Sequence, residues 1–312
     1  MKKFLCLILC LLLVFSFSSC AQKSGAVRIG VLKGPTGLGA SYLMEQNESG
    51  KSLNNYEFTV AGAADELTGR LLSGDLDIAA LPTNTISVLY NKSGGEVVSL
   101  GVNTLGVLYI LEKGDSVQSF RDLEGKTVVA AGQGTTVEYI LSALLAGYGI
   151  SADVVWTSEH SETVTRALSG DADIVILPEP MVTNLLAKSG DYRVAISLTD
   201  VWEVLGKGVL PMGGFAVRKA FLEENPAAVK NFITEYGNSV RFVNENVSEG
   251  AAFAEKFDII AASVAEKAIP RCNMVWLTGD DAEKALGNFL HVLYKLNPAS
   301  IGGTVPDNAF YS

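Results

Sequence analysis

Short apolar runs alternate with amphipathic segments along most of this chain. The short runs have the length and β-branched content of buried strands, and the segments between them carry apolar residues at helical spacing. Strands that alternate with helices in this way form parallel sheets covered by helices. The pattern therefore predicts an α/β fold with mainly parallel sheets. In the first part of the chain, the expected strands are 27–32, 57–60 and 77–81, and the expected helices are 37–46, 64–73 and 83–90.

The chain contains a repeated unit. Residues 72–82 read LSGDLDIAALP and residues 168–178 read LSGDADIVILP, so eight of eleven positions are identical at an offset of 96. The same offset relates an i,i+4 glutamate–arginine pair that starts at Glu66 to one that starts at Glu162. The sequence therefore predicts a duplicated α/β unit that forms two lobes. In the second copy, the expected strands are 127–131, 154–156 and 174–177, and the expected helices are 137–146, 162–169 and 181–187.

The remaining segments predict how the lobes connect. We expect residues 97–103 and 107–112 to be strands that cross between the lobes, and residues 209–217 to form the return crossing. Two apolar helical stripes follow, one after Pro226 and one from Ala282, and we expect both to pack back onto the first lobe. The predicted domains are lobe 1 at residues 27–105 and 213–312, and lobe 2, which includes crossing strands, at residues 106–212.

The N-terminus has the pattern of a bacterial export signal. Lys2 and Lys3 precede an apolar run at residues 4–17, which as a helix would span about 21 Å and is too short for a bilayer core of about 30 Å. The run ends in Phe-Ser-Ser-Cys20, which resembles a lipobox with Phe17 in place of the usual leucine. Ordinary signal cleavage after a small residue is the alternative. The predicted segments are a lipoprotein signal peptide at residues 1–19 and a tether at residues 20–26 that is lipidated on Cys20.

Composition and charge exclude several partners. The chain carries 24 basic and 34 acidic side chains, and its net charge of −10 repels nucleic acids and anionic membrane surfaces. A hydrophobic content of 48% argues against a disordered chain. Of the four cysteines, only Cys272 follows Cys20, so the mature chain has no partner cysteine for an internal disulfide. With only two histidines besides, we expect neither a metal site nor a cofactor.

The motifs in the sequence do not indicate an enzyme. Gly125-Lys126-Thr127 lacks the earlier glycine of a phosphate-binding loop, and the loop at residues 132–134 lacks the third glycine of a dinucleotide-binding motif. Ser158, Glu159 and His160 are catalytic residue types, but chain neighbours do not face one another as members of a triad do. We therefore expect a binding protein. A secreted enzyme on the same scaffold and an adhesion or signalling module are the alternatives.

Candidate binding residues follow the predicted strands. In open parallel sheets, ligands bind beyond the carboxyl ends of the strands, where loops and helix N-termini present backbone N–H groups. Threonine, asparagine and glutamate side chains in such loops supply further donors and acceptors. The alternative for Thr83, Thr135 and Thr136 is that they only cap helices. The candidates are Lys33, Thr36, Thr83, Asn84, Asn103, Thr104, Gly134, Thr135, Thr136, Glu159, His160, Glu179 and Met212.

Three segments carry a family resemblance. Residues 122–136, the repeat at 168–174 and Pro178-Glu179-Pro180 resemble the solute-binding proteins of ABC importers, and the likeness runs from Val27 to the C-terminus. The most similar group is the nitrate/taurine/aliphatic-sulfonate type, which also includes binders of thiamine-precursor pyrimidines. The resemblance implies a two-lobed periplasmic-binding-protein-like (type II) fold that closes over a small solute. It also implies that an ABC permease, and through it an ATPase, is the partner of a monomer held to the outer face of the cytoplasmic membrane by its lipid alone.

The charges in the candidate loops favour one ligand class. The loops contain one cation, Lys33, against Glu159 and Glu179, which disfavours a sulfonate or nitrate, since such anions are held by cationic side chains and helix N-termini. We therefore expect an amino-bearing heterocycle, such as a thiamine-precursor pyrimidine, and keep the anion as the alternative. Glu159 fits equally well as a solvated residue at a helix N-terminus. Glu179 is the stronger candidate because the two flanking prolines restrict the backbone around it.

Overall fold

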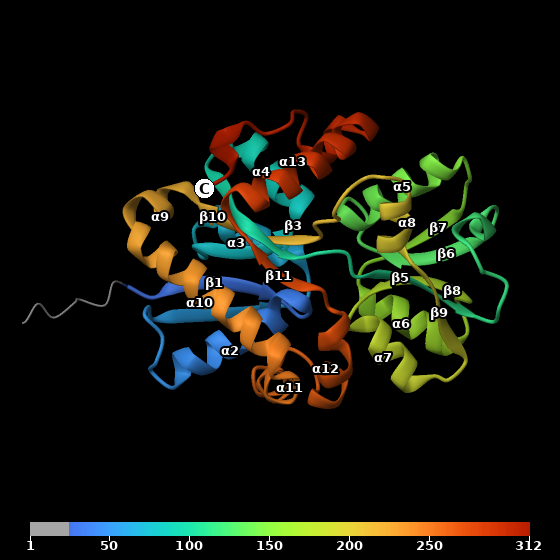
Figure 1. The fold of residues 1–312 in the computed structure, drawn as a ribbon, viewed down its shortest axis with the longest axis horizontal. Coiled ribbons are helices and arrows are strands. Elements are labelled where there is room, and N and C mark those ends of the chain that lie inside the picture. The colour runs from blue at the N-terminus through green and yellow to red at the C-terminus, as the bar shows by residue number, and fades with distance from the viewer. Residues whose placement is uncertain (1–24) are drawn as a thin grey trace, which may run out of the picture.

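A computed structural model describes residues 25–312 of the chain. The predicted signal peptide, Cys20 and most of the tether therefore lie outside the described residues. Two sheets, each with helices against both faces, form the two halves of the molecule (Figure 1). This confirms the predicted α/β fold. We call the part built on the six-stranded sheet lobe 1 and the part built on the five-stranded sheet lobe 2.

Lobe 1 has the strand order β11–β4–β10–β3–β1–β2. The strands of the first repeat copy pair in parallel, with Ile29 opposite Ile78, and β10 runs antiparallel between β3 and β4. The repeat therefore forms one half of the sheet, and antiparallel strands complete it. The strand bounds are β1(Val27–Leu32), β2(Tyr56–Ala61), β3(Ile78–Pro82), β4(Val97–Thr104), β10(Gly213–Arg218) and β11(Met274–Leu277).

Lobe 2 has the strand order β7–β6–β8–β5–β9. The second repeat copy again pairs in parallel, and β5 runs antiparallel between β8 and β9. Thus β5 has the place in lobe 2 that β10 has in lobe 1. Both sheets are therefore mixed and not mainly parallel as expected, because each includes antiparallel strands from outside the repeat. The strand bounds are β5(Leu108–Lys113), β6(Thr127–Ala131), β7(Asp153–Thr157), β8(Ile174–Pro178) and β9(Tyr192–Ser197).

The helices begin close to where the apolar periodicity predicts them. The helices of lobe 1 are α2(Pro35–Glu48), α3(Ala64–Ser73), α4(Thr83–Ser93), α9(Lys219–Glu224), α10(Pro226–Glu245), α11(Val247–Lys256), α12(Ala262–Ala268) and α13(Gly279–Leu296). Those of lobe 2 are α5(Thr136–Tyr148), α6(His160–Ser169), α7(Met181–Lys188) and α8(Leu198–Val204). The short 3₁₀ helices are η2(Phe120–Leu123), η3(Ile269–Arg271), η4(Pro298–Ile301) and η5(Asn308–Phe310).

The expected crossing strands do not cross. β4 pairs with β10 and β11 inside lobe 1, and β5 pairs with β8 and β9 inside lobe 2. Each strand pairs within one sheet, so between residues 25 and 312 the chain passes from lobe to lobe at two short links, residues 105–107 and 205–212.

The two late helices pack onto lobe 1 as predicted, and α13 also contacts lobe 2. The apolar stripe of α13, which ends at Leu293, is fully buried, and that of α10 is buried except for Ile233, which is half-buried. In α13, Phe289 packs against Trp202 of α8 with ring centroids 5.7 Å apart. An aromatic pair of this kind adds about 0.5–1.5 kcal/mol beyond the area that it buries. The helices that follow the second link therefore stabilise both lobe 1 and the junction.

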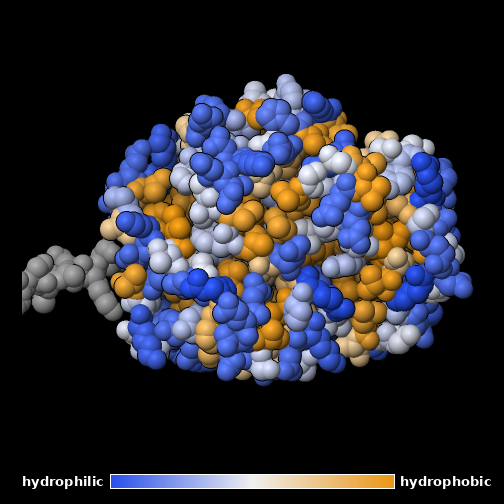
Figure 2. All heavy atoms as spheres, in the orientation of Figure 1, coloured by the Kyte–Doolittle hydropathy of each residue, from blue (hydrophilic) through white to orange (hydrophobic). Residues whose placement is uncertain are grey.

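The face of the molecule drawn in Figure 2 is mostly hydrophilic. On the face shown in Figure 2, hydrophilic side chains cover most of the outline, and hydrophobic ones show as separate patches between them. Among the helices of residues 25–312, none combines the length and the apolar character needed to cross a membrane.

Candidate functional site

The N-termini of α4 and α5 meet across the lobe boundary. Asn84, in the first turn of α4, accepts a hydrogen bond of 2.9 Å at Oδ1 from Thr136 Oγ1 at the start of α5. Its Nδ2 atom donates to the Gly134 carbonyl at 3.4 Å, and to the Ser300 carbonyl of lobe 1 at 3.2 Å. Asn84 is 1% exposed, so these contacts are shielded from water. The structure thus brings Asn84, Gly134 and Thr136 together from the two lobes.

The link at residues 205–212 is hydrogen-bonded to lobe 1 next to Asn84. Thr83 Oγ1 donates to the Pro211 carbonyl at 2.8 Å, and the Thr83 amide donates to the Met212 carbonyl at 3.2 Å. Met212 in turn donates its amide to the carbonyl of Thr104 at 2.9 Å. Asn103 is fully buried beside Thr104, and its Nδ2 has no hydrogen-bond partner among residues 25–312. These four candidates therefore lie together where the link leaves lobe 1.

Glu179 is held by residues of both lobes. It follows β8 and is 0% exposed, and its Oε2 accepts from the amide and the hydroxyl of Thr183 in α7, at 3.1 and 2.8 Å. Its Oε1 lies 2.8 Å from Nε of Arg271, which belongs to η3 of lobe 1. Arg271 also donates from Nη2 to Thr183 Oγ1 at 2.5 Å. A single guanidinium therefore bridges from lobe 1 to two side chains of lobe 2.

Burial dominates the electrostatics around Glu179. It raises the pKa of the Glu179 carboxyl, and the hydrogen bonds from Thr183 and the charge of Arg271 offset this only in part. Tyr109 of β5 and Cys272 lie close enough to feel the Glu179 carboxylate. Burial raises the pKa values of both groups, and the negative charge of Glu179 raises them further. Cys272 is free and fully buried, which makes it an unreactive thiol. Thr183 and Arg271 are thus the groups that favour the ionised form of Glu179 against its burial.

His160 and Glu159 stand at the start of α6 and differ in exposure. Burial lowers the pKa of His160 to about 4, while the charge of Glu159 acts in the opposite direction. The imidazole is therefore neutral near pH 7, and its buried Nδ1 has no hydrogen-bond partner in the part of the chain that the structure describes. Glu159 is exposed and accepts from Ser161 Oγ at 2.9 Å. Its contact is the one expected of a solvated residue at a helix N-terminus.

Three other candidates make contacts within their own lobe. Lys33 is exposed, and its Nζ lies 3.0 Å from Asp258 Oδ2. Thr36 Oγ1 accepts from the Leu32 amide at 3.1 Å, which ties the start of α2 to β1. Thr135 caps α5, because its hydroxyl accepts from the Val137 amide at 3.3 Å. The helix-capping alternative therefore describes Thr135, while Thr83 and Thr136 make contacts beyond their own helices.

Arg271 is the residue that sequence reasoning missed. It lies in the turn between α12 and β11, in no recognisable motif, and nearly one hundred positions after its partner Glu179. The one available signal was indirect, since a buried carboxylate requires a cation or several hydrogen bonds. That rule does not identify which of the 24 basic residues supplies the charge.

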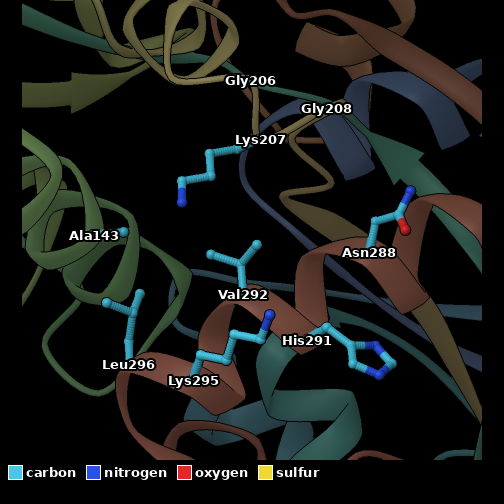
Figure 3. Close-up of a pocket in the computed structure, with 9 residues that line it drawn as sticks. All are labelled: Ala143, Gly206, Lys207, Gly208, Asn288, His291, Val292, Lys295 and Leu296. Atoms are coloured by element: carbon cyan, nitrogen blue, oxygen red, sulfur yellow. The ribbon is translucent and has the colours of Figure 1, made fainter.

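A cavity of about 470 Å³ lies beside the second link and apart from the strand ends (Figure 3). It contains none of the thirteen candidates. In Figure 3, the side chains of Lys207 and Lys295 reach toward the space around Val292, whereas the His291 ring points away from it. Within residues 25–312, no group of three or more His, Cys, Asp or Glu side chains is arranged to hold a metal ion. The cavity is lined by Ala143, Gly206, Lys207, Gly208, Asn288, His291, Val292, Lys295 and Leu296.

A protein-family comparison decides the family. Residues 42–268 match the family described as "ABC transporter, phosphonate, periplasmic substrate-binding protein". The chain belongs to this family. As its member, this binding protein captures a small solute for an ABC transporter, which confirms the predicted resemblance to ABC solute-binding proteins. No curated protein sequence matches the chain.

Solved structures share the fold of this binding protein. An ABC transporter protein from Parabacteroides distasonis superposes with a TM-score of 0.78 at 22% identity, covering 93% of this chain and 99% of that one. The periplasmic aliphatic sulphonate-binding protein SsuA from Escherichia coli gives 0.72 at 15% identity, with 93% and 92% covered. The alkanesulfonate-binding protein SsuA from Xanthomonas axonopodis pv. citri, bound to MOPS, gives 0.72 at 16% identity, with 92% and 96% covered. The last two are binding proteins, and all three structures support the two-lobed fold.

Proposed function

We propose that this binding protein is a monomeric receptor, anchored by lipid to the outer face of the cytoplasmic membrane, that delivers its solute to an ABC permease. Its two lobes would be residues 27–105 with 213–312, and residues 106–212. The two short links support this division, because they leave each sheet in one lobe. Lipid on Cys20 would hold the receptor near its permease.

The anchor is tested by changing the cysteine. Cys20→Ala removes the acylation site, so we expect the protein to move from the membrane fraction to the soluble fraction of the cell envelope or the medium. Fractionation followed by mass spectrometry of the N-terminus measures both the location and the lipid. Retention of the variant in the membrane, together with an unlipidated wild-type N-terminus, would contradict the anchor.

For the solute, we propose a small polar molecule with an amino or ring N–H donor, such as an aminopyrimidine, that binds to Glu179. The observation that carries this proposal is the fully buried carboxylate of Glu179, which faces the opposite lobe. Burying a carboxylate is costly unless donors satisfy it, so a solute that brings a donor gains a charge-assisted hydrogen bond. The neutral His160 and the buried amide of Asn103 add polar groups without adding charge.

A phosphonate or sulfonate is the second candidate, and Arg271 is the observation that favours it. Its guanidinium lies at the lobe boundary, and arginine binds such oxyanions with two parallel hydrogen bonds. The family description and the two sulfonate-binding relatives point the same way. Against it stands Glu179, whose charge neutralises Arg271 at a distance of 2.8 Å.

Two substitutions, one that removes a negative charge and one that removes a positive charge, distinguish the two candidate solutes. Glu179→Gln should weaken binding of an aminopyrimidine by about ten- to a hundredfold, the value of one charge-assisted hydrogen bond. Arg271→Gln should leave that binding equal or tighter. Calorimetric titration with an aminopyrimidine and with an alkylphosphonate measures both effects.

The reverse pattern would contradict the proposed solute and support the anion. In that case Arg271→Gln weakens binding of the alkylphosphonate, and Glu179→Gln leaves it equal or tighter. Glu112→Gln is the matched control, because Glu112 is also a buried carboxylate of lobe 2 and pairs with Arg193 away from the lobe boundary. It should lower the stability of the protein but leave solute affinity unchanged.

A further inference from the structure

We propose that Arg271 is an internal competitor of the solute. From lobe 1, it occupies the acceptor group formed by Glu179 and Thr183 in lobe 2, and it holds the lobes together until a donor group of the solute takes its place. This inference rests on the proposed use of Glu179 as the solute acceptor. Its own test needs no solute, so the two proposals fail separately.

Arg271 contacts the acceptor group in lobe 2 as a bound ligand would. Nε and Nη2 reach two different side chains, Oε1 of Glu179 at 2.8 Å and Oγ1 of Thr183 at 2.5 Å. Thr183 itself donates to the other carboxylate oxygen, so the three side chains form one connected network. The contact with Glu179 is an ion pair, because Oε1 has no hydrogen-bond partner among residues 25–312, and the guanidinium adds one hydrogen bond through Thr183.

The two partners approach from elements on opposite sides of the boundary. Arg271 ends η3, which follows α12, whereas Thr183 lies in the first turn of α7. α12 packs beside α7, and Figure 1 shows the two helices next to each other below the middle of the molecule. Opening the lobes must therefore break the contact, and closing them forms it again.

Burial explains why the solute and Arg271 must compete. Glu179 has no exposed surface with Arg271 in place, while 44% of the Arg271 side chain is exposed. A solute therefore reaches Glu179 only after a covering group has moved, and the guanidinium is the charged neighbour that comes from the opposite lobe. The exposed part of Arg271 weakens the pair relative to a fully buried one, which allows exchange. Both partners belong to the chain, so the contact forms without any solute.

Hydrogen exchange in buffer without added solute tests the contact between the lobes. In Arg271→Ala, we expect the Thr183 amide and the segment 262–271 both to exchange about ten- to a hundredfold faster, because one charge-assisted contact that holds the lobes is lost. Arg271→Lys keeps the charge but not the fork, and should lie between this variant and the wild type. Unchanged exchange in α7, or faster exchange in 262–271 alone, would overturn the proposal.

Arg193→Ala is the matched control. Arg193 pairs with buried Glu112 at 2.8 Å and has an exposure similar to that of Arg271. Its three partners, Glu112 and the carbonyls of Gly114 and Val117, all lie in lobe 2. Its loss should speed exchange at Ser116 and Val117, whose amides donate to Glu112, and leave 262–271 unchanged. If the control also speeds exchange in 262–271, the effect of Arg271→Ala is general destabilisation and the proposal fails.

A small guanidinium ion tests whether the acceptor group accepts donors other than Arg271. In Arg271→Ala, ethylguanidinium below denaturing concentrations should restore slow exchange at Thr183, and ethylammonium should do so less well. Because the added ion is not attached to lobe 1, exchange in 262–271 should stay fast. Failure of ethylguanidinium to protect Thr183 relative to sodium chloride of equal ionic strength would overturn the competition.

Discussion

The two copies of the repeat build the same local structure and use it differently. α3 and α6 both end in a left-handed glycine, Gly74 and Gly170, each with a φ of 83°. The next aspartate in each copy accepts from the preceding serine, at 2.9 Å for Asp75 and 2.8 Å for Asp171. These features depend on a few neighbouring residues, and identical neighbours give identical geometry.

The two copies differ at the aspartate two positions later, which is Asp77 in lobe 1 and Asp173 in lobe 2. Asp77 of lobe 1 is 2% exposed and contacts Arg28 at 2.6 Å and Arg218 at 2.7 Å. Burial by itself would raise the pKa of Asp77, but the hydrogen bonds from the two arginines outweigh it and hold the pKa below its usual value. Asp173, the equivalent residue of lobe 2, is exposed.

The strands beside each aspartate explain the difference. In the sheet register, Thr127 of β6 stands where Arg28 stands in β1, and Lys113 of β5 stands where Arg218 stands in β10. The Lys113 ammonium lies 3.5 Å from Asp191, a different partner. The comparison teaches that a repeated motif predicts its own backbone, whereas its charge partners depend on strands that arrive from elsewhere in the chain.

The same contrast applies to the site. By the offset of 96, Thr83 of lobe 1 corresponds to Glu179 of lobe 2, and both follow the third strand of their copy. Thr83 binds the link at Pro211, and Glu179 binds Arg271 of the other lobe. The threonine of the first copy therefore holds the link between the lobes, and the glutamate of the second copy forms an ion pair across the lobe boundary.

The largest expected effect comes from neutralising the two aspartates separately. Asp77→Asn should lower the free energy of unfolding by about 3 kcal/mol, the lower end of the range for a broken buried pair, because both arginines are partly exposed. Asp173→Asn should change it by less than about 0.5 kcal/mol, as is usual for exposed positions. Urea denaturation measures both values. Equal effects in the two copies would contradict the contrast in charge partners.

A smaller effect, equal in both copies, is expected at the glycines. Gly74→Ala and Gly170→Ala each place a side chain at a positive φ, which costs about 1 kcal/mol. A Cβ atom at Gly74 would meet nothing closer than 3.8 Å, and one at Gly170 would meet nothing within 4 Å, so no clash adds to the backbone term. The same denaturation measurement should give matching losses. A loss at one position only would show that tertiary contacts influence even this local feature.

The sequence predicted the elements because their signals are local. The helix at 64–73 agrees at both ends with α3, and the strands expected at 27–32 and 127–131 agree with β1 and β6. The crossing strands were misplaced because β4 and β5 are adjacent in the chain and both apolar. Their hydrogen-bond partners in separate sheets come from distant segments.

For the candidate site too, local signals could be predicted from the sequence and distant partners could not. Asn84 and Glu179 could be selected from the sequence because each follows a predicted strand, and strand ends are where ligands bind in such sheets. Their partners could not be selected. Thr136 was a candidate in its own right, but nothing in the sequence places it on Asn84, and Arg271 had no local signal at all.

By itself, the sequence determined the duplicated α/β unit, the approximate places of its helices and strands, and a candidate glutamate between two prolines. These features follow from periodicity and turn chemistry over a few residues. Only the tertiary structure decided that Asp77 is buried with two arginines while Asp173 is exposed, and that Arg271 bridges the lobes to Glu179. Charge–charge contacts depend on distances in space, and those distances exist only once β10 and the C-terminal helices have returned to complete lobe 1.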